Sequence, residues 1–152
     1  MSYLQNGDFE SGEFPPDWGV QGTPRVYDGV AELKAGDKIN QNFKTSTPGP
    51  SSLFVEMELF VEGGSGPATG DVQVVFVFQT EAGSPISQTF NVPEPDNLQR
   101  LQIRLNLPSK PTSGFVEFLV QQRVTKVLKL DSVLLEDGAD HPDVATTGFQ
   151  SA

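Results

Sequence analysis

The chain has 152 residues, of which 36% are hydrophobic and 20% charged, so it is long enough for one domain with a core of its own. Twenty acidic residues against ten basic ones give a formal net charge of −10, which argues against nucleic acid or an anionic membrane as partner. The absence of cysteine excludes disulfides, thiol catalysis and thiolate metal sites.

Apolar and polar residues alternate with period two along most of the chain, which predicts β-strands. Such segments follow one another at residues 26–35, 37–45, 52–62, 71–80, 85–92, 98–107, 115–123 and 126–136. The first is interrupted by Asp28-Gly29, a turn signal, and the glycine-rich residues 63–70 predict a loop between two strands. We therefore expect nine or ten short strands.

One segment, residues 71–80, is apolar on both faces. Val75 and Val77 alternate with Val74, Phe76 and Phe78. This pattern is typical of a central strand that is covered on both sides, by its own domain or by a partner chain.

These elements predict an all-β fold, a two-sheet antiparallel β-sandwich of the jelly-roll type. We expect the domain to span residues 1–136 and to be followed by a polar tail at residues 137–152, in which Phe149 is the one large apolar residue. Because Phe54 and Phe60 point outward beside glutamates, we also expect a homo-oligomer or a larger assembly, with Phe149 anchoring the tail on a neighbour.

Motifs at both ends of the chain resemble the jelly-roll carbohydrate-binding modules attached to xylanases and glucanases. The matching pieces are "NGDFE" with a following tryptophan, a glycine-containing strand, a glutamine-led strand, a Pro-Gly turn and an aliphatic-Asp-x-Val-x-Leu strand; here they are Asn6 to Glu10 with Trp18, Gly29, Gln41, Pro48-Gly49, and Leu130 to Leu135. The same fold and motifs occur in spore surface proteins and phage particles, so the resemblance implies a fold and leaves the ligand open.

The resemblance also implies a structural Ca²⁺ that ties the N-terminal segment to the last strand. Carried over by position, its ligands are Asp8, Glu10 and Asp131, with backbone carbonyls near Asp28-Gly29. Mixed carboxylate and carbonyl sets suit Ca²⁺, and the cation would relieve the repulsion between Asp8 and Glu10. Ser132 stands where the family usually has a second acid. The residues alone favour ordinary turn acids, with Asp8 capping a turn and Glu10 solvated, and only the resemblance favours the ion.

Nothing in the sequence predicts an enzyme. His141, the single histidine, lies in the polar tail beside a proline, where we expect it to be exposed. A glycosidase needs two carboxylates across a cleft, but Glu56, Glu58 and Glu62 share one strand face and, with Glu117, are typical of a solvated surface.

Polar residues on outward strand positions form the candidate ligand or interface face. They are Gln73, Gln79, Gln102, Arg104, Glu117, Gln121 and Arg123. This layer could bind a sugar, pair with another subunit or meet solvent. The sequence offers no obvious aromatic platform, since the family pattern places Trp18 in the core and Tyr3 and Tyr27 are the only tyrosines.

Two functions follow as hypotheses. The first is a non-catalytic structural subunit of an extracellular assembly such as a phage particle, spore surface or filament. The second is a glycan-binding module that works with a polysaccharide-degrading enzyme. Both imply an extracellular or particle-surface location, although residues 1–3 lead into the first motif without a visible secretion signal.

Overall fold

The computed structural model describes residues 2–5, 7–9, 17–45, 50–64, 70–95, 97–122 and 125–151. These ranges contain eleven strands and one 3₁₀ turn: β1 (Gly19–Gln21), β2 (Arg25–Tyr27), β3 (Val30–Leu33), β4 (Lys38–Lys44), β5 (Ser52–Glu62), β6 (Val72–Thr80), β7 (Ile86–Asn91), β8 (Gln99–Asn106), β9 (Pro111–Val120), β10 (Val127–Asp137), η1 (Gly138–Asp140) and β11 (Gln150–Ser151). Within them, no helix is long and apolar enough to span a membrane.

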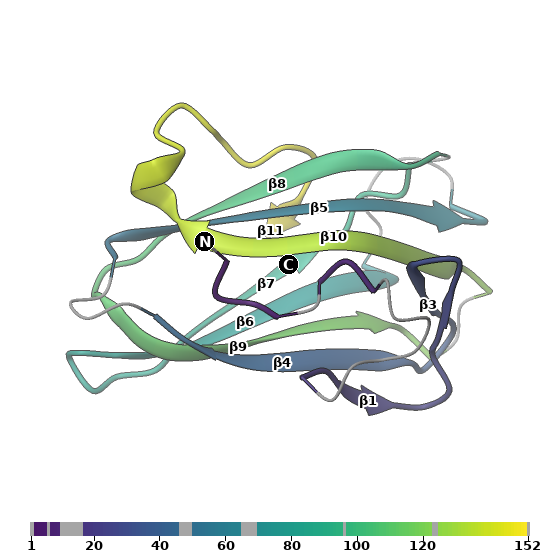
Figure 1. Cartoon of the computed structure of the whole chain (residues 1–152), viewed down its shortest axis with the longest axis horizontal. Helices are drawn as coiled ribbons and strands as arrows, with labels where there is room; N and C mark the ends of the chain where they lie inside the picture. The colour runs from purple at the N-terminus through teal and green to yellow at the C-terminus, as the bar shows by residue number, and fades with distance from the viewer. Residues whose placement is uncertain are drawn as a thin grey trace.

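The strands form two antiparallel sheets packed face to face (Figure 1). One has six strands in the order β1-β4-β9-β6-β7-β11, and the other has five in the order β2-β3-β10-β5-β8. The predicted all-β sandwich is therefore confirmed. The short edge strands β1 and β11 were not predicted, because two or three residues carry no readable alternation.

The alternation predicted from the sequence places the core between the sheets. On β5, Val55, Met57 and Leu59 are fully buried, as expected. On β6, the inward residues Val74, Phe76 and Phe78 are fully buried, whereas Val75 and Val77 on the other face are half-buried. Since β6 pairs with both β9 and β7, it is the central strand that its two apolar faces predicted.

The break at Asp28-Gly29 is a hairpin turn between β2 and β3, whose flanking residues Tyr27 and Val30 are paired. Asp28 and Gly29 have φ values of 54° and 74°. Two consecutive positive φ values match the right-handed twist of a two-residue hairpin, and an Asp-Gly pair adopts them at low cost.

The N-terminal segment (residues 2–5 and 7–9) closes one side of the sandwich, between β10 and β4 (Figure 1, purple). Its backbone continues the five-stranded sheet beyond the end of β3: the Tyr3 N–H donates to the Leu135 carbonyl at 2.7 Å, and the Val133 N–H donates to the Gly7 carbonyl at 3.0 Å. Two reciprocal hydrogen bonds join the segment to the six-stranded sheet. The Gln41 side-chain amide accepts from the Gln5 N–H at 2.7 Å and donates to the Gln5 carbonyl at 3.0 Å.

The C-terminal residues 138–151, here called the strap, close the opposite side, between β8 and β7. They leave the end of β10, cross the edge of β8 and end as β11, paired with Asn91 and Phe90 of β7 (Figure 1, yellow). Phe149 is 7% exposed and belongs to the core. The expected polar tail anchored on a neighbour is therefore wrong: the strap is part of the same sandwich, and the domain does not end at residue 136.

Side-chain contacts hold the strap against β5 and β8. His141 stacks on Phe54 with ring centroids 3.9 Å apart and lies 2.8 Å from Glu136 through Nε2. Arg104 donates through Nη1 to the His141 carbonyl at 2.7 Å. Phe54 is consequently 1% exposed, so neither it nor Phe149 is the interface residue that the sequence suggested, and His141 is not an exposed tail histidine.

Phe149→Ala should destabilise the fold by about 3–5 kcal/mol, because it leaves a cavity in a shared core. The measurement is the urea midpoint of unfolding. Asp143→Ala, an exposed strap residue, is the matched control and should change stability by less than about 0.5 kcal/mol. Equal midpoints for Phe149→Ala and the wild type would show that the strap is not docked.

Gly114→Ala should also destabilise, by about 1–3 kcal/mol, through overpacking. A Cβ on this β9 residue would lie 2.7 Å from Phe43 Cζ and 2.9 Å from Phe78 Cδ1, two rings in an edge-to-face contact. Ser113→Ala, the neighbouring outward position, should be nearly neutral. The idea fails if thermal melts of the two variants coincide.

Candidate functional site

The outer face of the six-stranded sheet carries rows of side chains set by strand register. Asn42 of β4 is paired with Phe115 of β9, which is paired with Val77 of β6. On either side lie the parallel rows Asn40–Glu117–Val75 and Lys44–Ser113–Gln79. The face thus combines amides, a few charges and one aromatic ring along its central row.

A trough begins at the edge of β4 beside the N-terminal segment, where inward and outward β4 residues both line it, and continues onto this face. It consists of two adjoining depressions of about 460 and 320 Å³ that share Asn42, Ser113 and Gly114. The first is also lined by Tyr3, Gln5, Asp17, Gln41, Phe43 and Lys44, and the second by Val77, Gln79 and Phe115. The trough therefore runs from the N-terminal segment across β4 and β9 to β6.

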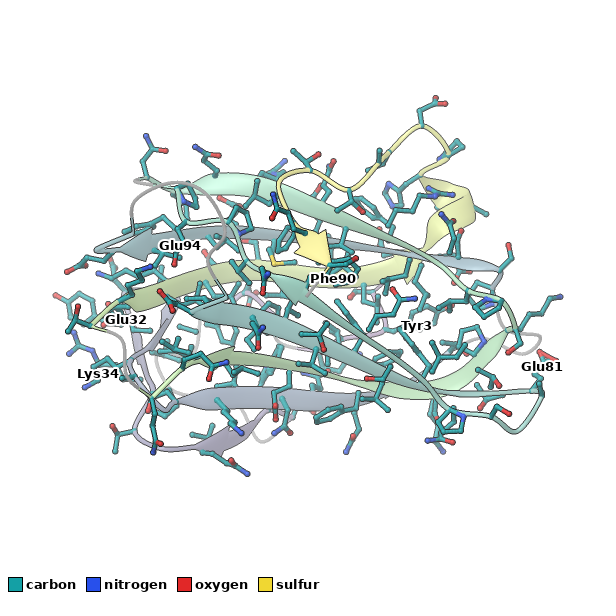
Figure 2. All side chains as sticks on the ribbon, turned by 180° about the vertical axis from the view of Figure 1, so that it is seen from behind. Tyr3, Glu32, Lys34, Glu81, Phe90 and Glu94 are labelled. Carbon is teal, nitrogen blue, oxygen red and sulfur yellow. The ribbon has the colours of Figure 1, made fainter. Side chains whose placement is uncertain are left out.

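The N-terminal segment forms one wall of the trough, and the Gln41–Gln5 pair holds that wall. Gln41 is 4% exposed, so its amide needs protein partners, and the Gln5 backbone supplies both. Tyr3 is fixed at the same place, because its hydroxyl donates to Asp137 at the end of β10. Figure 2 shows Tyr3 toward the same end of the sandwich as Glu81.

Phe115 supplies the aromatic surface that sequence analysis did not find. It is half-buried on the outer face, between Asn42 and Val77. The alternation along the strand does place Phe115 outward, since it lies two residues before the outward Glu117. It was overlooked because only tryptophan and tyrosine were considered as sugar-stacking residues.

A third depression, of about 370 Å³, lies at the other end of the same face. Gln21, Lys38, Leu119, Gln121 and Gln122 contribute to its lining. Next to it runs a chain of amides, in which Gln121 donates to Gln73 at 3.1 Å and Gln73 donates to Asn91 at 3.1 Å. This end of the face therefore offers hydrogen-bonding groups without an aromatic ring.

The predicted ligand face is divided between the two sheets. Gln73, Gln79 and Glu117 lie on the outer face of the six-stranded sheet, and Gln121 directly follows β9. Gln102 and Arg104 lie on β8 of the other sheet, so the expectation that all seven residues share one face is wrong. Arg123 lies outside the described residues.

Gln102 and Arg104 hold structure together on their own sheet. Gln102 donates to Glu56 at 3.0 Å, and its carbonyl accepts from the Thr147 N–H of the strap at 3.0 Å. Arg104 binds the strap carbonyl of His141. Sequence alternation correctly placed both outward but could not reveal that the strap covers them.

The remaining outer face of the five-stranded sheet is a network of ion pairs. Glu32 pairs with Arg25 at 2.8 Å and with Lys129 at 3.5 Å, and Lys129 also pairs with Glu62 at 3.1 Å. Burial opposes the ionisation of Glu32, but the hydrogen bond from Arg25 and the charge of Lys129 outweigh it and hold the pKa of Glu32 below its usual value. Glu56 and Glu58 face Arg100, at 3.8 and 3.6 Å.

Three of the expected calcium ligands lie among the described residues, and Glu10 lies outside them. Asp8 and Asp131 are each within two residues of the Gly7–Val133 hydrogen bond, beside a bulge in β10. Asp131 accepts from the Ser132 N–H at 2.8 Å, and Ser132 and Phe9 both have φ near 52°. Asp28 lies in the β2–β3 turn, beside a depression that Lys129 also lines.

These positions fit the implied ion in part. The Gly7–Val133 hydrogen bond brings the backbone near Asp8 and the backbone near Asp131 together from the two ends of the chain. Across the described ranges, however, no three acidic or histidine side chains cluster as a metal site. Asp28 lies in a turn, whose backbone carbonyls are compatible with the expected role as calcium ligands.

Comparison with known proteins identifies the fold but no sequence family. No family model matches the chain, and no curated protein matches it.

Several solved structures share the fold. A family 61 carbohydrate-binding module, solved in complex with β-1,4-galactotriose, is 16% identical, with 90% of this chain and 99% of that chain covered and a TM-score of 0.56. A family 4 carbohydrate-binding module is 13% identical over 88% of this chain and 98% of that chain, with a TM-score of 0.61.

A third match is the enzymatically active domain of tailspike protein 4 from bacteriophage CBA120. It is 11% identical with a TM-score of 0.60 and covers 90% of this chain but only 21% of that chain. The expected resemblance is confirmed at the level of fold: this chain is a β-sandwich of the carbohydrate-binding-module type.

Proposed function

We propose that this protein is a non-catalytic glycan-binding module whose ligand lies in the trough on the six-stranded sheet. The observation that carries the proposal is Phe115, an aromatic ring on an open sheet face, with Asn42 beside it on β4 and Val77 beside it on β6. Gln79 lines the same depression. Sugars present an apolar C–H face that stacks on aromatic rings and hydroxyls that bond to amides and carboxylates.

The size and lining of the trough support this function. Each of its depressions lies within the range of about 300–1,000 Å³ that is usual for small-ligand sites. Asn42, Gln79 and Gln5 supply donors and acceptors, while Asp17 and Lys44 add one charge of each sign. A neutral polysaccharide suits this balance, and binding it would place the protein outside the cell or on a particle surface.

A structural subunit of an extracellular assembly is the second candidate. It is supported by the half-buried Val75 and Val77 on the same face and by the likeness to part of a phage tailspike. In this case the face would pair with another copy or another protein. Light scattering at high protein concentration distinguishes the two candidates. A glycan-binding module should be a monomer, whereas a structural subunit should form oligomers.

Phe115→Ala should weaken glycan binding by about tenfold or more, because about 1.4 kcal/mol of stacking accounts for a factor of ten. Affinity gel electrophoresis with soluble xylan, β-glucan and galactan measures it. Phe60→Ala is the matched control, a half-buried phenylalanine on the outer face of the other sheet, and should migrate like the wild type. If no polysaccharide retards the wild type, the glycan-binding proposal is wrong.

We further propose that Ca²⁺ binds Asp8, Glu10 and Asp131, with carbonyls near Asp28-Gly29, and pins the N-terminal segment to β10. Support comes from the meeting of Asp8 and Asp131 beside the Gly7–Val133 hydrogen bond. The ion would add to the hydrogen bonds that already join this segment to the sheet.

Calcium should then stabilise the fold by about 2.7 kcal/mol when its free concentration is a hundred times the dissociation constant. A chelator should lower the melting temperature of the wild type, and Asp131→Ala should abolish the response to added Ca²⁺. Glu62→Ala, an exposed acid four residues along β5 from Glu58, the partner of Asp131, should leave the response intact. Identical melts of the wild type with and without chelator would contradict the site.

A further inference from the structure

Three charged side chains meet at one end of the sandwich, away from the trough. Lys126 Nζ lies 2.7 Å from Asp71 Oδ2 and 2.8 and 2.9 Å from the two carboxylate oxygens of Glu94. Glu94 is fully buried, while the side chains of Lys126 and Asp71 are 15% and 34% exposed. Figure 2 shows Glu94 at the same end as Glu32 and Lys34, opposite Glu81.

The three residues come from different parts of the fold and are held there by backbone contacts. Asp71 directly precedes β6 of the six-stranded sheet, and Lys126 directly precedes β10 of the five-stranded sheet. The Asp71 carbonyl accepts from the Gln121 N–H at 2.8 Å. Glu94 lies between β7 and β8 and packs closely against Gly64. A Cβ added to Gly64 would lie 2.8 Å from the Cβ of Glu94.

The resting state of this cluster is an ammonium between two carboxylates. Hydrogen bonds that Lys126 donates to Asp71 and then to Glu94 raise the pKa of Lys126, so the lysine is charged at neutral pH. With one cation shared between two acids, the cluster carries an excess negative charge, and its Glu94 carboxylate is buried away from water.

We propose that Lys126 and Asp71 condense to an intramolecular amide, with Glu94 transferring the proton. Glu94 takes a proton from the Lys126 ammonium, and the freed Nζ attacks Cγ of Asp71, the atom bonded to the oxygen that it already contacts. The new bond is Nζ–Cγ, and the bond that breaks is Cγ–Oδ. The leaving oxygen takes two protons, one through Glu94, and departs as water, so ammonium plus carboxylate gives amide plus water.

Proximity is the physical basis of the reaction. Amide formation between free amines and carboxylates in water is unfavourable, but groups held in contact reach effective molarities of about 10⁵–10⁸ M. A proton carrier within hydrogen-bond distance of the nucleophile, as Glu94 is, meets the geometric requirement for general acid–base catalysis. The product replaces the Lys126–Asp71 ion pair by a neutral amide, and the single negative charge of the cluster then rests on Glu94. The new amide N–H, at the position of Nζ, lies within hydrogen-bond distance of the Glu94 oxygens and can donate to them.

The bond would tie the two sheets together where the N-terminal segment does not reach. That segment joins β10 near Val133 and Leu135, whereas Lys126 precedes the other end of the same strand. The covalent link would make the opening of the sandwich at this end impossible without breaking a bond.

Mass spectrometry of the intact, purified protein tests the proposal. We expect the wild-type chain to be lighter than its sequence mass by one water, about 18 Da. Proteolysis should release a branched peptide in which Lys126 is joined to Asp71. Asp71→Ala and Lys126→Arg should show the full sequence mass, and Glu94→Gln should keep the ion pair but form the amide much more slowly.

Two results would overturn the proposal. One is a wild-type chain that keeps its full mass after prolonged incubation at neutral pH. The other is a loss of water that persists in Asp71→Ala, because succinimide formation at Asp28-Gly29 or Asp137-Gly138 loses the same mass. Circular dichroism of each variant checks that it is folded, so that the absence of the amide bond cannot be attributed to unfolding.

Discussion

The reciprocal hydrogen bonds between the Gln41 amide and the Gln5 backbone join the two sheets on a side that neither closes alone. Gln41 is buried, and leaving its amide unpaired would cost about 1–3 kcal/mol for each lost partner. The pair therefore commits the N-terminal segment to one path between β10 and β4. That path builds one wall of the trough, so the site depends on a structural contact. On the opposite side, the strap joins β8 to β7 in the same way.

The two outer faces of the sandwich differ in what is left for a ligand. On the five-stranded sheet, Glu32 and Lys129 are engaged in ion pairs, and His141 covers Phe54. On the six-stranded sheet, the trough leaves Phe115, Asn42 and Gln79 facing outward. Strand register alone causes this difference between the two faces. It determines which side chains lie side by side across the strands, and which of these rows lies next to the N-terminal segment or the strap. Glycan binding is accordingly proposed for the face whose polar groups are least committed to one another.

Local alternation predicted the strands and the inward residues because a half-buried strand repeats every two residues. It could not predict which strands share a sheet, since pairing joins distant segments: Gln102 and Gln73 look equivalent in sequence but lie on opposite sheets. The strap was mistaken for a tail because its contacts come from backbone pairing and from scattered side chains such as His141 and Phe149, which leave no periodic pattern. The Lys126 cluster was missed for a similar reason, as its three members are separated in sequence and meet only through topology.

Mapping of backbone amide chemical shifts during titration with gluco-, xylo- and galacto-oligosaccharides tests the central claim, that a glycan binds in the trough walled by the N-terminal segment. The account predicts that shifts concentrate on Gln5, Asn42, Val77, Gln79 and residues 113–115. They should fade toward β5 and β8. Shifts confined to the five-stranded sheet, or no shifts with any of the sugars, would contradict it.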